Sequence, residues 1–292
     1  MELDGIEHGV GVTALMVAAA RAIEHHRPDA LAHDGFAEHF VRAAEVSRTW
    51  PVRPQDVPDG DAHPVWGRLA RYFGLRTRVL DDFTEASADA GAHQVVLLGA
   101  GLDSRAYRLR WPAGSTVFEV DRAAVLEFKQ GVLREMRATP EPVRTPVAAD
   151  LRLDWARALL DAGFDPARPT TWLAEGLLLY LPAAAEEALI ARVDRLSAPG
   201  SRCAYEIKSV REVREFTESP VYRLAKEEIG VDLLALFDDD ARPDSAAALA
   251  ARGWTTTTRT PFHYTALHGR GPLPQPCDAL ATNLWVFAVK DV

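Results

Sequence analysis

The sequence predicts an α/β protein built on one mostly parallel, Rossmann-like sheet. Short apolar runs alternate with helical patterns through the middle of the chain, the first run leads into a Gly-x-Gly turn, and acidic residues follow later runs. Alternating strands and helices build a parallel sheet through right-handed crossovers. The runs are almost continuously apolar, which is typical of strands covered by helices on both faces.

Length and composition fit one elaborated domain or two small ones, and we expect a single domain over residues 1–292. Composition also disfavours two classes of partner. The 292 residues, 48% of them hydrophobic, suffice for one large core. The net charge of −9 argues against nucleic acid and membrane partners, and no run approaches the roughly 18 apolar residues of a membrane helix. We expect a cytoplasmic protein and leave its oligomeric state open. Cys203 and Cys277 lack metal-site spacing, so no metal is expected.

The first 90 residues are expected to form a helical cap that precedes the sheet. The run TALMVAAARAI at 13–23 is dense in good helix formers. A connection at 48–64 contains four prolines, and helical spacing returns from Val65. No strand-like run occurs before Gln94, which places the whole sheet after the cap.

The remaining chain divides into a cofactor-binding core at 94–208, a helical insertion with the acceptor region at 209–253, and closing strands at 254–292. The expected strands occupy residues 94–101, 115–121, 145–150, 170–180, 201–207, 254–260 and 284–290. We expect the last strand to be antiparallel. The Gly- and Pro-rich segment 263–277 between the closing strands is expected to be a loop.

The strongest local signal is VVLLGAGLDSR, a strand that runs into Gly99, Ala100 and Gly101. Glycines at this turn let the backbone bend sharply and let a ligand approach without a Cβ in the way. The third glycine of a dinucleotide fingerprint is missing, with Arg105 near its place, which weakens a pyrophosphate interpretation. Gly-x-Gly alone fits a plain tight turn equally well.

An acid follows the second strand at the spacing of a ribose-binding residue. Asp121 lies about twenty residues after Gly99, where a carboxylate accepts hydrogen bonds from both ribose hydroxyls. A solvated acid at a strand end is the simpler explanation for Asp121 alone, but the coupling to the glycine turn favours cofactor binding. Glu119, two residues earlier, is the alternative on the same strand face.

Two further acids fall at the ends of the third and fourth strands. Ligands of open α/β sheets bind at the carboxyl ends of the strands, where these acids converge with Gly99 and Asp121. Asp150 is placed to accept from an adenine amine while Leu151 covers the ring; the alternative role for Asp150 is a helix N-cap. Glu175 interrupts an apolar run and requires a partner, either a cationic ligand group or an arginine such as Arg105.

The motifs together resemble the leucine carboxyl methyltransferase family, in particular its bacterial branch of S-adenosylmethionine-dependent O-methyltransferases often associated with polyketide and other secondary metabolism. The motifs that carry the resemblance are RTRVLDDF, VVLLGAGLDSRAYRL, WPAGSTVFEVD, AADLR and WLAEGLLLYLP, in order from about residue 76 to 182. TALMVAAARA and HDGFAEHFV extend the resemblance to the N-terminus. The region after Ser209 matches least well, so the acceptor stays unidentified.

The resemblance implies a class I methyltransferase fold with a helical cap and S-adenosyl-L-methionine as cofactor. It implies Asp121 at the ribose, Asp150 and Leu151 at the adenine, and Glu175 near the methionine end. It also implies that Arg76 pairs with the cofactor carboxylate. Solvated helix arginines remain the ordinary interpretation of Arg76, Arg78 and Arg105.

The implied reaction is methyl transfer to a carboxylate or hydroxyl of a small molecule. Tyr180, just past the fourth strand, is the leading acceptor-side residue, as a hydrogen-bond donor that orients the nucleophile. His263 and His268 are candidate bases for a hydroxyl acceptor. The alternatives are an NAD(P)-dependent oxidoreductase that uses the same strand, turn and acid, and a catalytically degenerate methyltransferase fold that only binds ligands.

Overall fold

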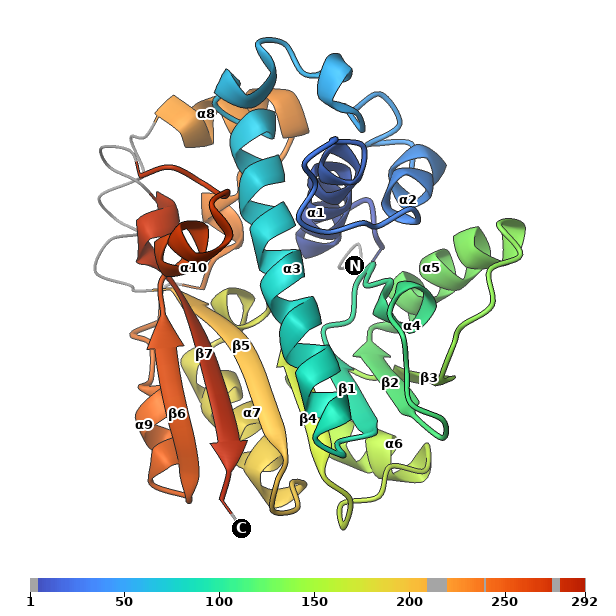
Figure 1. Ribbon diagram of the computed structural model, residues 1–292, viewed down its shortest axis with the longest axis vertical. Coiled ribbons are helices and arrows are strands. Elements are labelled where there is room, and N and C mark those ends of the chain that lie inside the picture. The colour runs from blue at the N-terminus through green and yellow to red at the C-terminus, as the bar shows by residue number, and fades with distance from the viewer. Residues whose placement is uncertain (1–4, 209–219, 239, 275–278, 292) are drawn as a thin grey trace.

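The computed structural model describes residues 5–208, 220–238, 240–274 and 279–291 and confirms the predicted α/β sheet. Seven strands lie in the order β3-β2-β1-β4-β5-β7-β6 (Figure 1). They are β1 Gln94–Leu98, β2 Thr116–Asp121, β3 Val143–Ala148, β4 Thr170–Ala174, β5 Arg202–Lys208, β6 Trp254–Arg259 and β7 Asn283–Lys290. Neighbours from β3 to β5 are parallel, whereas β7 runs antiparallel to β5 and β6, as expected for the last strand.

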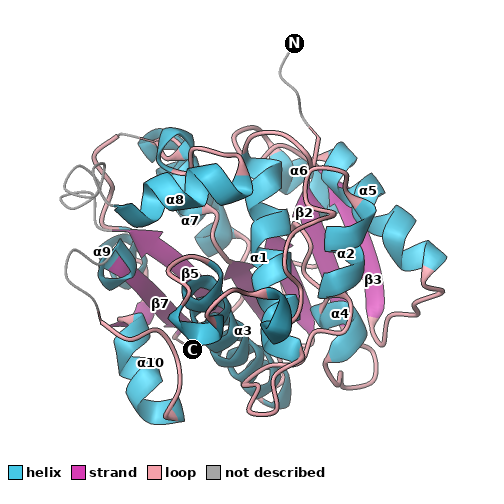
Figure 2. Ribbon diagram, turned by 90° about the horizontal axis from the view of Figure 1, so that it is seen from above, coloured by secondary structure: helices cyan, strands magenta, loops and turns pink. Residues whose placement is uncertain are grey.

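Helices cover both faces of the sheet and one of its ends. The helices are α1 Val10–His25, α2 Ala37–Ala43, α3 Trp66–Asp89, α4 Arg105–Arg108, α5 Ala123–Glu135, α6 Trp155–Asp161, α7 Ala183–Arg195, α8 Pro220–Ile229, α9 Ser245–Ala250 and α10 Pro261–His268. Seen from above, α1 and α2 lie over the β1–β3 side of the sheet and α8 lies over the β5–β7 side (Figure 2). The part of the expected insertion at 209–219, and Cys277, lie outside the described residues.

The expected helical cap is formed by α1, α2 and α3. The 24-residue helix α3 runs from the cap down across one face of the sheet (Figure 1). On α1, Ala18, Ala19 and Ala22 are completely buried. Small side chains let two helix backbones approach closely, and α1 packs on α3 along this surface. The cap is therefore part of the main hydrophobic core.

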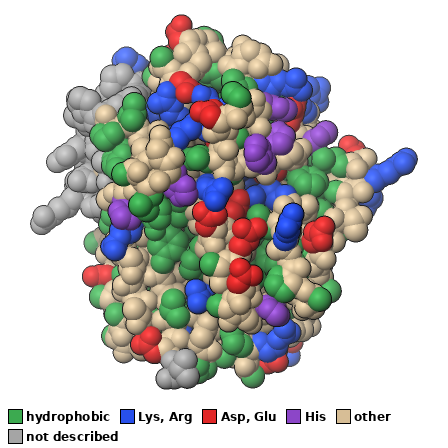
Figure 3. All heavy atoms as spheres, in the orientation of Figure 1, with side chains coloured by type: hydrophobic (Ala, Val, Ile, Leu, Met, Phe, Trp, Pro, Cys, Tyr) green, Lys and Arg blue, Asp and Glu red, His purple; other side chains and the backbone are tan. Residues whose placement is uncertain are grey.

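Burial follows the position of each strand in the sheet. Every residue of the central strands β1 and β4 is buried, as the continuous apolar runs predicted. The edge strand β3 is largely exposed, and in the other edge strand, β6, exposed residues alternate with one buried and two half-buried residues. Acidic and basic side chains are interspersed on the molecular face drawn in Figure 3. Within the described ranges, no helix has the length and hydropathy of a membrane span.

Two segment predictions were wrong. The expected strand 170–180 ends at Ala174, because Gly176 takes a positive φ of 61° and a short 3₁₀ turn, Leu178–Tyr180, follows. The expected loop 263–277 begins inside helix α10. Thr260 caps this helix by accepting from the His263 amide, Pro261 occupies its first turn, and Gly269 ends it with a φ of 68°.

The segment after α10 is joined to the cap through a buried carboxylate. Arg270 donates to both oxygens of Glu24, over 2.7 and 2.6 Å, and the Leu31 amide donates to the same side chain over 2.7 Å. Glu24 lies between α1 and α3, where a Cβ added at Gly74 would come within 2.6 Å of it. The absence of a side chain at Gly74 therefore makes room for this carboxylate.

We expect Gly74→Ala to lower the free energy of unfolding by about 1–3 kcal/mol, because the Glu24 carboxylate has to shift and weaken its bonds to Arg270. The matched control is Gly131→Ala in α5, where a Cβ meets nothing within 4 Å. The free energy of unfolding of Gly131→Ala should rise by up to about 1 kcal/mol, because alanine has a higher helix propensity than glycine. Urea unfolding measures both, and equal stability of the two variants would contradict this account.

Candidate active site

A cavity of about 910 Å³ lies where the parallel strands end beneath the cap. Much of its wall comes from the strand ends and from two cap helices. The strand ends supply Gly99, Asp121, Asp150 and Glu175, while α1 and α3 supply mainly apolar side chains. Ligand pockets usually have volumes of about 300–1,000 Å³, so this cavity lies near the upper end of that range.

The glycine turn after β1 forms one wall with its backbone. Gly99 and Gly101 have φ values of 65° and 46°, and the amides of Gly99 and Ala100 both donate to the Val120 carbonyl, over 2.9 and 3.1 Å. A Cβ at Gly99 would lie 3.0 Å from a methyl group of Leu177. The sequence thus needs glycine here both for the conformation and for the close approach.

Asp121 ends β2 and lies against the glycine turn. Its two carboxylate oxygens accept from the amides of Gly101 and Arg122, each over 2.7 Å. Burial raises the pKa of the Asp121 carboxyl, and these two hydrogen bonds oppose the rise. Each carboxylate oxygen can accept more than one hydrogen bond, so Asp121 can still accept from hydroxyls of a ligand in the cavity.

Asp150 and Leu151 line the cavity after β3. Two alternative predictions were wrong, the N-cap role of Asp150 and the placement of Glu119 in the site instead of Asp121. Asp150 accepts from the Arg152 side chain over 2.6 Å, and this hydrogen bond lowers the pKa of its carboxyl. The N-cap of α6 is Asp154 rather than Asp150. Glu119, the alternative to Asp121, is fully buried, pairs with Lys129 and Arg144, and does not line the cavity.

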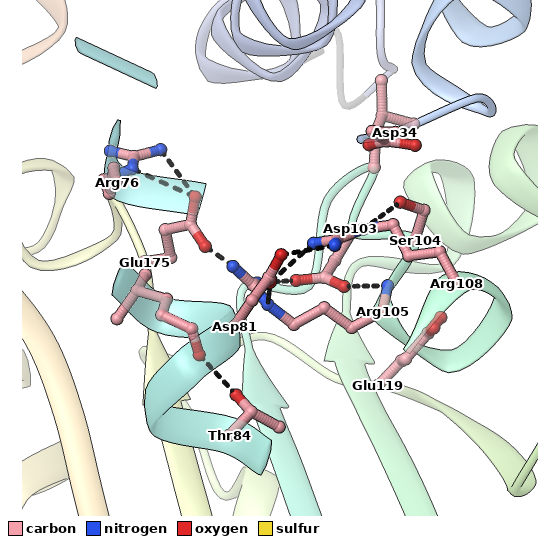
Figure 4. A network of polar contacts seen from close by, with 12 residues as sticks. Asp34, Arg76, Asp81, Thr84, Asp103, Ser104, Arg105, Arg108, Glu119 and Glu175 are labelled. Atoms are coloured by element: carbon pink, nitrogen blue, oxygen red, sulfur yellow. Dashed lines mark hydrogen bonds and ion pairs between the residues drawn. The ribbon is translucent and has the colours of Figure 1, made fainter. Parts of the chain in front are cut away.

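Glu175 lies between two arginines on the cavity floor (Figure 4). Arg76 of α3 approaches one carboxylate oxygen at 2.9 Å, and Arg105 of α4 approaches the other at 2.9 Å. Burial alone would raise the pKa of Glu175, but the charges of Arg76 and Arg105 outweigh it and hold the pKa well below its usual range. The carboxylate is ionised, and arginines supply the partner that the sequence required.

Arg105 is the centre of a larger buried network that the sequence did not reveal. It is 1% exposed and pairs with Asp81 and Asp103 as well as with Glu175. Arg108 also binds Asp81, so α3 and α4 are joined through this carboxylate (Figure 4). Arg78, by contrast, is exposed and pairs with Asp82, as expected for an ordinary helix arginine.

Glu206 of β5 extends the network and was also missed. It accepts from Arg76 over 2.6 Å and from the hydroxyl of Tyr72. Asn283 of β7 donates to the same hydroxyl over 2.7 Å. The signal in the sequence resembles the one that drew attention to Glu175, because Glu206 follows Cys203, Ala204 and Tyr205 and precedes Ile207 in a largely apolar run. The Arg76 guanidinium thus has two carboxylate partners and still faces the cavity.

Tyr180 lines the cavity, and burial raises the pKa of its hydroxyl to about 12, so that it acts as a donor rather than a base. Its ring centroid lies 5.8 Å from that of Phe237. The two histidines proposed as bases are not among the cavity-lining residues, because α10 carries His263 and His268 elsewhere. No described group of His, Cys, Asp and Glu could hold a metal ion.

The ordered sheet, the helical cap and the strand-end pocket define a class I methyltransferase fold. A model of the leucine carboxyl methyltransferase family matches residues 14–194. A relative from Streptomyces coelicolor is 59% identical over 286 residues, covering 98% of this chain and 94% of the relative. A relative from Rhodococcus jostii is 44% identical over 300 residues, covering 99% of this chain and 100% of the relative. The chain belongs to the leucine carboxyl methyltransferase family.

Both relatives are named as inferred S-adenosyl-L-methionine-dependent methyltransferases, the cofactor class that the sequence predicted. Among solved structures, a DUF574 family protein from Streptomyces avermitilis has a TM-score of 0.55 at 17% identity, covering 92% of this chain and 98% of that protein. This likeness supports the fold alone.

The depressed pKa of Glu175 makes stability depend on pH. Because its pKa is lower in the folded than in the unfolded chain, ionised Glu175 stabilises the fold above its ordinary value of 4.5, and this contribution is lost as the pH falls. We expect Glu175→Gln to flatten the loss of stability between about pH 5 and pH 3 by up to about 1.4 kcal/mol per pH unit. Urea unfolding across this range measures the slope.

At neutral pH the free energy of unfolding of Glu175→Gln should be about 3 kcal/mol lower than that of the wild type. Arg76 and Arg105 remain buried in this variant without the negative charge of Glu175. Glu187→Gln on the exposed face of α7 is the control and should keep the wild-type profile. A wild-type slope in Glu175→Gln would show that Glu175 does not stabilise the fold as an ionised group.

Proposed function

We propose that this protein is an S-adenosyl-L-methionine-dependent O-methyltransferase that acts on a small molecule. The observation that carries the proposal is the convergence of the glycine turn, Asp121 and Glu175 on one cavity at the strand ends. The family membership supports methyl transfer. The carboxyl methylation in the family's name supports oxygen as the accepting atom.

Residues around the cavity can bind the adenine, the ribose and the methionine part of this cofactor. Asp121 would accept from the ribose hydroxyls, and Asp150 from the adenine amine, with Leu151 against the ring. Arg76 has donors left for the cofactor carboxylate, because a guanidinium carries five. Glu175 would attract the ammonium and sulfonium charges, since its carboxylate is ionised and lines the cavity.

Bound there, S-adenosyl-L-methionine supplies an electrophilic methyl group on a positively charged sulfur. The protein has to place an acceptor oxygen in line with that methyl and to exclude water. The cap helices enclose the cavity with apolar side chains, and Tyr180 can donate to the acceptor and orient it. An ionised acceptor needs no general base, which agrees with the position of both candidate histidines outside the cavity.

A cavity of about 910 Å³ suits a small-molecule acceptor beside the cofactor. We further propose a cytoplasmic role in secondary metabolism, with neither nucleic acid nor membrane as a partner. The resemblance to bacterial O-methyltransferases of that kind supports the metabolic role, and the net charge of −9 supports the absence of polyanionic partners.

Calorimetric titration with S-adenosyl-L-methionine, S-adenosyl-homocysteine, NAD and NADP tests the cofactor. We expect micromolar binding of the two sulfur compounds and none of the nicotinamide nucleotides. Arg105 supports this outcome, since its buried side chain stands near the position where a dinucleotide site needs glycine for close helix approach. Binding of NAD or NADP alone would establish the oxidoreductase alternative, and turnover of no acceptor despite tight binding would favour a degenerate fold.

We expect Asp121→Ala to weaken S-adenosyl-homocysteine binding at least 10-fold, because a carboxylate–hydroxyl hydrogen bond contributes about 1.5–3 kcal/mol. Asp161→Ala serves as the control, because this exposed acid of α6 pairs only with Arg157 among its described neighbours. Both variants should keep the wild-type circular dichroism spectrum. Unchanged affinity in folded Asp121→Ala would remove Asp121 from the site.

A further inference from the structure

One group of cavity residues has no part in the cofactor assignment. It consists of Lys208 at the end of β5, Tyr222 of α8, Phe237 and Tyr180, and all four line the cavity. The Lys208 ammonium donates to the Tyr222 hydroxyl over 3.1 Å and lies 4.9 Å from the centroid of the Phe237 ring. The Tyr180 ring packs against the same Phe237 ring, with 5.8 Å between the two centroids. We call these four residues the lysine cluster.

The sheet order places the lysine cluster away from the ribose-binding acid. Lys208 ends β5 and Asp121 ends β2, and strands β1 and β4 lie between them. Neighbouring strands are about 4.8 Å apart, so the two side chains start roughly 14 Å from each other along the sheet edge. The cavity therefore extends from a cofactor end over β1–β3, past Glu175 after β4, to a second end over β5, below α8 (Figure 1).

Lys208 brings a positive charge to this second end that the described residues do not neutralise. Across residues 5–208, 220–238, 240–274 and 279–291, no carboxylate forms an ion pair with it. Glu206, two residues earlier on the same strand face, is engaged by Arg76 and Tyr72. An ammonium carries three donors, and only the bond to Tyr222 uses one within these residues.

Tyr222 adds a second donor beside the ammonium. Its hydroxyl oxygen accepts from Lys208, so its own hydrogen has to point away from the ammonium. An anionic group beside the pair can accept from a remaining hydrogen of the ammonium and from the outward-pointing hydroxyl. Two convergent donors, one of them charged, form a site for an anionic oxygen.

The wall that α3, α8 and the segment after α8 contribute to the cavity is largely apolar. Its side chains in one hydrophobic cluster are Leu69, Phe73, Ala225 and Leu233. A ligand at this end would thus bury an apolar body while its single charged group meets Lys208.

We propose that Lys208 and Tyr222 bind the ionised oxygen of the methyl acceptor, and that the acceptor is an apolar molecule with one acidic oxygen group, a carboxylate or a phenol. The inference rests on the proposed methyl transfer. The ammonium favours the ionised form of the acid and fixes the oxygen that attacks. That oxygen forms the new bond to carbon with its own electron pair, sulfur keeps the pair of the broken bond, and no proton moves.

The test compares two probes of the same shape and different charge, 2-naphthoate and 2-naphthamide. Calorimetry measures their affinity for protein saturated with S-adenosyl-homocysteine. We expect wild-type protein to bind 2-naphthoate at least 10-fold more tightly than 2-naphthamide, because a charged hydrogen bond contributes about 1.5–3 kcal/mol. Lys208→Met should reduce the preference below about 3-fold without weakening 2-naphthamide, and Lys208→Arg should retain part of it.

Lys226→Met is the matched control, since this exposed lysine of α8 pairs with Asp232 outside the cavity. It should keep the wild-type preference. Titration with 2-naphthol distinguishes a carboxylate acceptor from a phenol acceptor. Binding of 2-naphthol with the absorbance of its anion indicates a phenol site, whereas binding of 2-naphthoate alone indicates a carboxylate site.

Three outcomes would overturn the inference. The wild-type protein binds 2-naphthoate and 2-naphthamide equally, it binds neither probe, or Lys208→Met keeps the wild-type preference. S-adenosyl-homocysteine affinity is measured first on every protein. If it is absent in the wild type, the proposed function fails; if it is intact and the probes show no preference, only the role of Lys208 fails.

Discussion

The buried ion pairs around Glu175 are the constraint on which the rest of the structure depends. They join the end of β4 to α3 through Arg76 and to α4 through Arg105. Removing charges from water is expensive, and the attraction between them compensates only when the geometry is good. The three elements can therefore meet in one arrangement only, and the cavity floor is fixed where the strand ends meet the cap.

The rest of the cap follows from the position of α3. Its apolar surface receives the alanines of α1, and Gly74 leaves space for Glu24, which Arg270 holds from the far end of the chain. Charge thus sets where α3 lies, and close apolar packing sets where α1 lies on α3. The cavity wall that would meet an acceptor is built from these helices, so its shape depends on the ion pairs below it.

Local patterns predicted the strands, the glycine turn and the acids at the strand ends, because each depends on residues close together in the sequence. The sequence left open whether Glu175 pairs with a ligand or with an arginine. Its two partners, Arg105 and Arg76, lie 70 and 99 positions away from it in the sequence, so no local pattern could identify them. Long arginine side chains look alike in sequence, and only the fold separates buried Arg105 from exposed Arg78. Helix α10 was missed although Thr260, Pro261 and Gly269 mark its two ends.

The charges along the cavity divide it between two kinds of ligand. Asp121, Asp150 and Glu175 lie toward one end and Lys208 toward the other. Arg76, Arg122 and Arg152 also line the acidic end, so a ligand there can carry charges of both signs, whereas a cationic molecule beside Lys208 would meet like charge. A positively charged methyl donor would therefore be disfavoured beside Lys208, which leaves that end to an acidic acceptor, and the reacting groups would meet over β4, next to Glu175.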